Sequence, residues 1–380
     1  MTGQLSDAAL SRTRVGSGIF GHAPIDCDIH PAVPSNKVLL PYFDDYWREA
    51  ILTRGIERLA WNLMSFPPNA PASARPDWRP KGDRPGSDLA MLQSQALDAF
   101  GTRFAICNCL HGAQMLHSED MAAVFCRAVN QWIAKEWLDR DPRLRASILI
   151  PLENPDLAVE EIERCAEDRR FVQVLMLAMG EMPLGRRYYW PIYRAAERLG
   201  LPIGVHAGSA YRHAPTSIGW PSYFLEDYMA QSAAFEGQIL SLVSEGVFAK
   251  FPELKVVFIE SGFTWLPAFM WRANKTWRGV RAEVPWVKKA PADIVRDHLR
   301  LTIQPVDSPG DPAQLEQIID QIGSDRVLLF STDYPHWHFE GTDALPAALS
   351  GPLAARVLVE NALETYTRLR TPIPAEKRLQ

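Results

Sequence analysis

Ionisable side chains stand at or near the ends of several strongly apolar segments of this sequence. Because side chains alternate along an extended chain, Asp28 and His30 point to the same side of the segment 25–30. Carboxylates that face an apolar mouth repel one another, and a divalent cation removes that repulsion. Two imidazoles and two carboxylates form a mixed nitrogen and oxygen ligand set that suits Zn²⁺ or Mn²⁺. The proposed metal ligands are Asp28, His30, His206 and Asp333.

The same group of residues also offers proton transfer. Glu260 ends the apolar segment 256–260, and it could move a proton, as could Asp333 if the metal does not hold it tightly. The metal would polarise a carbonyl or carboxylate group, or activate a bound water molecule. Each of these residues alone also fits a structural role in a core. Their joint placement at the ends of apolar segments indicates a catalytic centre, with Asp333 and Glu260 as the candidate catalytic residues.

Parallel strands are the elements predicted to position these residues. Short apolar and β-branched runs alternate with amphipathic helical segments, a pattern typical of strands covered by helices. The alternation favours a (β/α)8 barrel over a doubly wound sheet, which more often has a glycine-rich phosphate turn after its first strand. In a barrel the carboxyl ends of all strands meet at one rim. The predicted strands cover residues 25–30, 104–109, 146–150, 172–177, 202–206, 256–260, 299–303 and 327–331.

Capping residues mark several of the intervening helices. Ser118 is predicted to begin a helix that has an apolar face, and Asn154 precedes Pro155 at the first position of the next one. Gly200 ends a helix over 189–199. These signals support strand–helix units along the central part of the chain.

The chain exceeds the about 250 residues of a plain barrel, and the surplus lies in long connections after predicted strands 1, 5 and 6. The connection 35–102 is predicted to contain helices over 42–64 and 88–100 and to form a wall or lid of the pocket. No internal repeat and no domain linker is evident. The predicted organisation is an N-terminal extension over 1–23, a single barrel domain over 24–370 and a C-terminal tail over 371–380.

The composition of the 380 residues is that of a globular protein, with 47% hydrophobic and 22% charged residues and a net charge of −5. This mildly acidic balance argues against nucleic acid or an anionic membrane as a partner. The five cysteines lie in apolar stretches without paired spacing, which favours free buried thiols. No apolar run approaches the ~20 residues of a transmembrane helix, and the N-terminus does not resemble a signal peptide. We expect a soluble, cytoplasmic protein.

Five motifs occur in order at or near the predicted strand ends. They are Asp26-x-Asp28-x-His30, His206-x-Gly208, Phe-Pro-Glu-Leu-Lys-Val-Val-Phe-Ile-Glu-Ser-Gly-Phe-Thr-Trp-Leu-Pro at 251–267, Thr-Ile-Gln-Pro at 302–305 and Phe-Ser-Thr-Asp-Tyr-Pro-His-Trp at 330–337. Together they resemble the amidohydrolase superfamily, specifically its amidohydrolase-related branch. That branch includes aminocarboxymuconate-semialdehyde decarboxylase, the resorcylate-type decarboxylases and several lactone or amide hydrolases. The resemblance covers about residues 24–370.

This resemblance implies a distorted barrel with one metal ion at its mouth. The ligands that it implies are Asp28, His30, His206 and Asp333. Family members usually carry His-x-His on the first strand, and Asp28 replaces the first histidine, which hardens the site towards Mn²⁺ or Zn²⁺. The sixth strand usually ends in a histidine that transfers a proton in the decarboxylases, and Glu260 stands there instead. Dinuclear relatives use a carboxylated lysine on the fourth strand, and residues 171–177 contain no lysine.

Two enzymatic hypotheses and one non-enzymatic hypothesis follow. The first is a mononuclear metal-dependent hydrolase of a small, cyclic, carboxylated substrate, in which Asp333 accepts the proton of water and Glu260 protonates the leaving group. The alternative is a metal-dependent non-oxidative decarboxylase of an aromatic or muconate-like acid, because a desolvated glutamic acid can donate a proton. The third is a non-catalytic metal-binding or interaction protein. The expected partner is a small-molecule substrate, and homodimer formation is left open.

Weaker candidates for substrate contacts lie near the predicted strand ends. They could supply a hydrogen bond, a cation for a substrate carboxylate or a ring for stacking. Plainer structural interpretations exist for several of them, including an exposed loop after the fifth strand, aromatic packing and a loop that shapes the pocket around His336-Trp337-His338. The candidates are His111, Arg212, His213, Trp265, Gln304 and His336.

Overall fold

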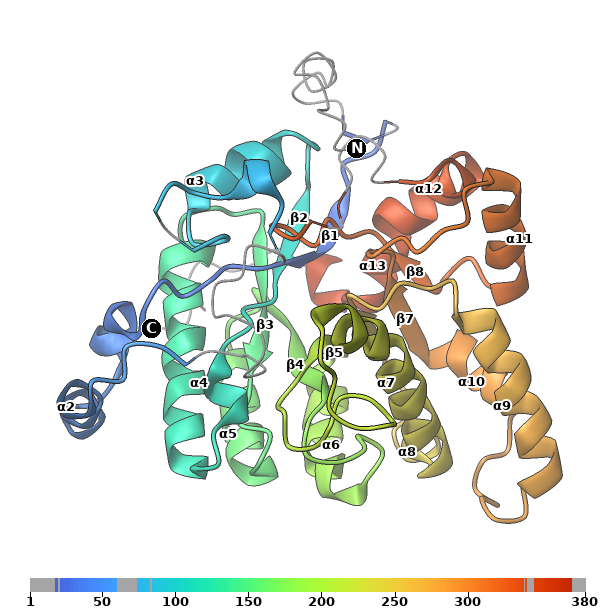
Figure 1. The fold of residues 1–380 in the computed structure, drawn as a ribbon, viewed down its shortest axis with the longest axis horizontal. Coiled ribbons are helices and arrows are strands. Elements are labelled where there is room, and N and C mark those ends of the chain that lie inside the picture. The colour runs from blue at the N-terminus through green and yellow to red at the C-terminus, as the bar shows by residue number, and fades with distance from the viewer. Residues whose placement is uncertain are drawn as a thin grey trace.

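Eight parallel strands form the centre of the molecule, with helices side by side around them (Figure 1). The computed structural model describes residues 18–19, 21–59, 74–82, 84–337, 339 and 345–370. Each strand pairs with the next strand in the sequence, in the order β1 to β8. This is the predicted (β/α)8 barrel. The strands are β1 (Ile25–Ile29), β2 (Phe104–Cys107), β3 (Leu144–Leu149), β4 (Phe171–Met179), β5 (Ile203–Ser209), β6 (Val256–Ile259), β7 (Leu299–Thr302) and β8 (Leu328–Leu329).

The first strand and the segment that follows β8 close the barrel. The Cys27 amide donates to the Phe330 carbonyl at 2.9 Å, and the His30 amide donates to the Tyr334 carbonyl at 2.8 Å. Between them, the Asp333 amide donates to the carbonyl of Asp28 at 3.0 Å. β8 is much shorter than the predicted strand over 327–331, because the chain beyond Leu329 leaves the ladder to make these contacts.

A buried side-chain contact reinforces this closure. Asp26 on β1 is fully buried, and its two carboxylate oxygens accept the Thr332 amide at 3.0 Å and the Thr332 hydroxyl at 2.6 Å. The same hydroxyl accepts the Tyr334 amide at 3.3 Å. Thr332 therefore holds the two ends of the barrel sheet together.

Replacing Thr332 with valine is expected to lower the free energy of unfolding by about 2–6 kcal/mol, since two buried partners lose their hydrogen bond at about 1–3 kcal/mol each. Thr332→Ser keeps the hydroxyl and loses one methyl group, which costs about 1 kcal/mol. Urea unfolding followed by tryptophan fluorescence measures both. Equal stability of the two variants would show that the hydroxyl contributes nothing to barrel closure.

The helices begin and end largely where the capping residues indicate. Ser118 caps α4 with its side chain, Asn154 caps α5 with Pro155 at the first position, and Gly200 ends α6 in the left-handed conformation. The helices are α2 (Asp45–Arg54), α3 (Leu89–Leu92), α4 (Glu119–Ile133), α5 (Pro155–Ala166), α6 (Trp190–Leu199), α7 (Phe224–Ser244), α8 (Val247–Lys250), α9 (Leu266–Val280), α10 (Pro291–His298), α11 (Pro312–Ile322), α12 (Pro352–Ala355) and α13 (Asn361–Thr365).

The long connection after β1 differs from its prediction in one respect. The predicted helix over 42–64 is shorter, because Gly55 ends α2 in the left-handed conformation with φ 64°; residues 60–64 lie outside the described part. The predicted helix over 88–100 is observed as α3, which continues into a π-helical segment over Gln93–Asp98.

This connection returns to the barrel mouth. The Ala32 amide donates to the Gly86 carbonyl at 2.9 Å. Gly86 has φ +79°, and a Cβ there would lie 2.2 Å from the His30 carbonyl oxygen, so only glycine allows this approach. The Arg75 amide donates to the Pro335 carbonyl at 2.9 Å. The described parts of this connection therefore border the ends of β1 and β8.

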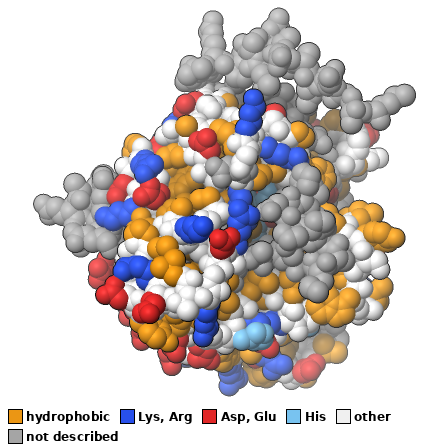
Figure 2. All heavy atoms as spheres, turned by 60° about the vertical axis from the view of Figure 1, so that its left-hand side comes forward, with side chains coloured by type: hydrophobic (Ala, Val, Ile, Leu, Met, Phe, Trp, Pro, Cys, Tyr) orange, Lys and Arg blue, Asp and Glu red, His pale blue; other side chains and the backbone are white. Residues whose placement is uncertain are grey.

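Buried apolar side chains of the strands and the surrounding helices form one continuous core. All nine residues of β4 are buried, as expected for a strand covered by helices. All five cysteines are buried and free, as predicted. Acidic and basic side chains are interspersed over the face drawn in Figure 2, without a patch of one sign. Within the described residues, no helix is both long and apolar enough to span a membrane.

Candidate metal centre

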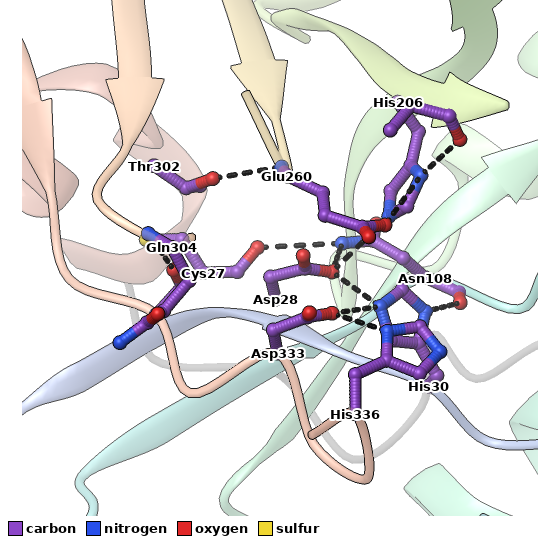
Figure 3. A network of polar contacts seen from close by, with 12 residues as sticks. Cys27, Asp28, His30, Asn108, His206, Glu260, Thr302, Gln304, Asp333 and His336 are labelled. Carbon is purple, nitrogen blue, oxygen red and sulfur yellow. Dashed lines mark hydrogen bonds and ion pairs between the residues drawn. The ribbon is translucent and has the colours of Figure 1, made fainter. Parts of the chain in front are cut away.

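Ionisable side chains from the ends of four strands, β1, β5, β6 and β8, meet at the mouth of the barrel (Figure 3). The Nε2 atom of His30 lies 2.9 Å from Asp333 Oδ1 and 3.2 Å from Asp28 Oδ1. His206 approaches from β5, with its Nε2 atom 3.5 Å from the same oxygen of Asp28. The rings of His30 and His206 meet edge to face, with centroids 4.9 Å apart. The structure thus brings together the four residues that we proposed as metal ligands.

Two further ionisable residues adjoin this group. Ligand atoms of His30, Glu260, Asp333 and His336 all lie within 4.8 Å of one another. His336 places its Nδ1 atom 2.7 Å from Asp333 Oδ1. Its ring lies 4.6 Å from that of His30. His336 is therefore part of the cluster, whereas sequence reasoning favoured a role in shaping the pocket loop. His338, the second histidine of this His-x-His motif, lies outside the described residues.

Two buried atoms of the centre have no hydrogen-bond partner within the described residues. They are the Oδ2 atom of Asp28 and the Nε2 atom of His206. Both side chains are completely buried, so bulk solvent does not reach these atoms, and an unpaired polar atom there is costly. A carboxylate oxygen and an imidazole nitrogen that face the same small space are the donors that Mn²⁺ or Zn²⁺ takes in proteins. The residues present therefore fit a single divalent cation.

Electrostatic interactions in the centre favour the ionised form of Asp28 and the protonated forms of His30 and His206. Burial alone would raise the pKa of Asp28, but the charges of His30 and His206 outweigh burial and hold this pKa well below its usual range. Burial opposes protonation of His30, but Asp28 and then Asp333 more than compensate, so that the pKa of His30 is raised. Asp28 likewise outweighs burial at His206 and raises its pKa.

Unusual backbone conformations direct two of these side chains. Glu260 and Asp333 have φ of 56° and 55°, in the left-handed region that non-glycine residues rarely adopt. Each follows its strand directly or within a few residues and turns the chain there. Hydrogen bonds hold both conformations: the Glu260 amide donates to Thr302 Oγ1 at 2.9 Å, and the Asp333 amide donates to the Asp28 carbonyl. Such strain, about 1–3 kcal/mol for each residue, is concentrated at functional sites.

Two residues that contact the site were not among the sequence candidates. The Tyr228 hydroxyl on α7 donates to Glu260 Oε1 at 2.9 Å. Nothing in the sequence distinguishes this tyrosine from others on a long helix. The Asn108 side chain donates to Asp28 Oδ1 at 2.8 Å. Asn108 directly follows the apolar strand β2, so the signal that identified Glu260, a polar residue at a strand end, was present for it too.

His111 and Gln304 lie near the mouth but outside the cluster. His111 is buried, and its Nδ1 atom accepts the Ala113 amide at 3.2 Å. Burial first, and then the charge of Arg84, lower its pKa to about 3, so its ring is neutral near pH 7. Gln304 is buried at the end of β7, and its Oε1 atom has no partner within the described chain.

The candidates in the loops after β5 and β6 are placed differently. Arg212 forms ion pairs with Glu153 at 3.2 Å and Glu181 at 3.4 Å, so its charge is already neutralised and it links three loops of the mouth. His213 is exposed. Trp265 precedes α9 rather than lying one turn into it, and its indole N–H donates to the Ser261 carbonyl at 2.9 Å.

Comparison with protein families identifies the chain. The profile of the family described as amidohydrolase matches residues 25–368. The chain belongs to the amidohydrolase family. The match begins at the first residue of β1 and ends beyond α13, so it includes every strand of the barrel and each residue of the metal centre. This confirms the family resemblance that the sequence motifs indicate.

Several curated relatives and structurally similar proteins are named as decarboxylases. Gamma-resorcylate decarboxylase from Polaromonas sp. (strain JS666) is 26% identical over 283 residues, which cover 68% of this chain and 83% of the relative. The fold matches that of 2,6-dihydroxybenzoate decarboxylase from Rhizobium with a TM-score of 0.65 and 21% identity, covering 92% and 100% of the two chains. Dihydroxybenzoic acid decarboxylase from Polaromonas sp. JS666, solved with manganese and 2-nitroresorcinol, has a TM-score of 0.63 and 19% identity, covering 92% and 98%.

Proposed function

We propose that this amidohydrolase is a metal-dependent non-oxidative decarboxylase of a hydroxylated aromatic acid. The observation that carries the proposal is the placement of a glutamate that is not one of the four proposed ligands, Glu260, beside the metal centre. Decarboxylation needs one proton for the carbon that loses CO₂, and a glutamic acid whose carboxyl group lies within 4.8 Å of ligand atoms of His30 and Asp333 could supply it. The decarboxylase relatives, matched over 83% of their length, favour this function over the hydrolase that sequence reasoning placed first.

The proposed ligands are Asp28, His30, His206 and Asp333. A divalent cation bound there would supply positive charge that binds and orients the anionic oxygens of the substrate. Asp28 and His206 are fully buried, and they keep water away from one side of this space. Gln304 contributes a buried acceptor near the mouth that could bind a substrate hydroxyl.

Glu260 carries the proton in this proposal. Tyr228 donates a hydrogen bond to Oε1, and the other oxygen, Oε2, lies 3.8 Å from His206 Nδ1. The protonated carboxyl group would transfer its proton to the ring carbon that bears the substrate carboxylate. The bond between that carbon and the carboxylate then breaks, its electron pair restores the aromatic ring, and CO₂ leaves. Glu260 remains as a carboxylate that solvent protonates again.

Isotope labelling tests this function. Mn²⁺-loaded protein is incubated with a panel that includes 2,6-dihydroxybenzoate and 5-carboxyvanillate, in D₂O and separately in H₂¹⁸O. We expect one CO₂ for each product molecule, one deuterium at the carbon that carried the carboxylate, and no ¹⁸O in the aromatic product. A second panel of lactones and amides is incubated in H₂¹⁸O in the same way. Products that contain ¹⁸O and form without release of CO₂ would instead establish the hydrolase.

A further inference from the structure

Buried polar side chains form a continuous chain of hydrogen bonds through the barrel interior, beginning at Asp28. It crosses the neighbouring strands β2, β3 and β4 and ends at a tyrosine that follows α13. All members have exposed fractions of 6% or less. The members are Asp28, Asn108, Ser147, Gln173 and Tyr366. Buried polar groups are costly unless they are paired, so a network of this length in the barrel interior calls for an explanation.

In every hydrogen bond of this network, the donor lies on the side of Tyr366 and the acceptor on the side of Asp28. The Tyr366 hydroxyl donates to Gln173 Oε1 at 3.1 Å, which turns the amide nitrogen of Gln173 the other way. That nitrogen donates to Ser147 Oγ at 2.7 Å and to Asn108 Oδ1 at 3.1 Å, and the Ser147 hydroxyl donates to Asn108 Oδ1 at 2.5 Å. With its oxygen occupied by two donors, Asn108 must present its NH₂ group to Asp28.

Asn108 contacts two of the proposed ligands. Its side-chain nitrogen donates to Asp28 Oδ1 at 2.8 Å, and its backbone carbonyl lies 3.0 Å from Nδ1 of His30 (Figure 3). The first contact fixes the orientation of the Asp28 carboxylate, whose Oδ1 atom also lies 3.2 Å from His30 Nε2 and 3.5 Å from His206 Nε2. The second contact makes Nδ1 of His30 the protonated nitrogen and leaves Nε2 as the lone-pair nitrogen that faces the centre.

The barrel makes room for this arrangement. Gly204 on β5 lies beside the carboxamide of Gln173, and a Cβ at this position would be 2.9 Å from Gln173 Cδ and 2.8 Å from Ile259 Cδ1. A larger residue at position 204 would displace Gln173 from its position between Tyr366 and Asn108.

We propose that Asn108 is a positioning residue of the metal centre, and that Ser147, Gln173 and Tyr366 fix the orientation of its amide. The inference rests on the proposed ligand set and is independent of which reaction the enzyme performs. Residues that orient metal ligands typically change metal affinity by about 10- to 100-fold when they are removed. A role in core stability alone would change the unfolding midpoint and leave the affinity of the folded protein for metal unchanged.

A comparison of two buried asparagines separates these roles. Asn130 is as buried as Asn108, and its side chain makes three hydrogen bonds, to Leu149 and Glu161 outside the metal centre. Dissociation constants for Mn²⁺ are measured by competition with a chelator, and the thermal midpoint of the metal-free protein is measured in parallel. We expect Asn108→Ala to weaken Mn²⁺ binding about 10- to 100-fold. Asn130→Ala should lower the midpoint and leave the dissociation constant unchanged.

Tyr366→Phe tests whether the far end of the hydrogen-bond network affects the metal centre, because it removes one hydroxyl group that contacts no proposed ligand. We expect it to weaken Mn²⁺ binding by roughly two- to tenfold in the wild-type background and to have no effect in the Asn108→Ala background, since coupled residues are not additive. Should Asn108→Ala fail to fold, Tyr366→Phe carries the test alone. An unchanged dissociation constant for Tyr366→Phe, or equal losses for the two asparagine variants, would overturn the proposal.

The ligand set itself is tested in the same titration with His206→Ala. If wild-type protein binds Mn²⁺ and His206→Ala binds it equally well, the proposed ligands are wrong. If His206→Ala loses Mn²⁺ while Asn108→Ala keeps full affinity, the ligands are right and only the positioning role of Asn108 fails.

Discussion

His206→Ala protein is expected to lose its metal and to fall at least about 10²- to 10³-fold in kcat/KM, a loss typical of removing one strong electrostatic contact in an active site. The physical reason is the position of the imidazole: Nε2 is buried, lies 3.5 Å from Asp28 Oδ1 and has no hydrogen-bond partner among the described residues. Alanine removes this nitrogen and leaves a space that cannot bind a cation. Metal content after dialysis, measured by mass spectrometry, checks the first effect, and steady-state rates check the second.

His22 offers a matched control for this variant. It precedes β1 and so lies at the opposite end of that strand from Asp28. His22→Ala should keep the metal and the rate of the wild type. A His206→Ala protein that retains one metal ion per chain would contradict the proposed ligand set.

Glu260→Gln is expected to lower kcat by about 10²- to 10⁴-fold, the contribution of a positioned proton donor, while metal content stays the same. Glutamine keeps the size of the side chain and accepts the hydrogen bond of Tyr228, but it cannot transfer a proton. Tyr228→Phe leaves the carboxyl group in place and removes only its hydrogen bond at Oε1, so a smaller loss of about tenfold is expected. Both rates are measured with saturating Mn²⁺.

The matched control is Glu253→Gln. Glu253 is exposed just before β6, at the opposite end of that strand from Glu260, and its replacement should leave the rate unchanged. Loss of metal from Glu260→Gln would mean that Glu260 is a ligand, which its distance to the other donors allows geometrically. A wild-type rate for Glu260→Gln would exclude it as the proton donor and direct attention to Asp333.

Strand positions were predictable because parallel strands inside a barrel are apolar along their whole length. All eight predicted strands overlap the observed ones, and β4 and β5 extend beyond their predictions by one to three residues at their ends. β8 is the strand that is shortened most, to Leu328–Leu329 from the predicted 327–331. Its apolar sequence matches the other strands, but tertiary hydrogen bonds from β1 claim the backbone after Leu329. Contacts between residues so distant in sequence leave no trace in local periodicity.

The clustering of the four proposed ligands was predictable because polar residues at apolar strand ends are conspicuous in the sequence. The supporting residues were not. Tyr228 reaches Glu260 from a helix, so its role depends on the path of a long connection. Arg212 resembled an anion-binding residue until the structure placed Glu153 and Glu181 beside it. Whether a charged residue is available to a substrate depends on its partners, and those partners come from other loops.

The closure of the barrel has a consequence for the order of events during synthesis. His30 and Asp333 are 303 residues apart in the chain yet meet at 2.9 Å. At ordinary rates of translation, Asp333 is added roughly 15 to 60 s after His30. Until then Asp28 and His30, joined later by His206, lack their fourth proposed partner and the segment after β8 that closes onto β1. Complete metal binding is thus a late step of biogenesis, and a metal-loaded molecule is one whose two ends have already met.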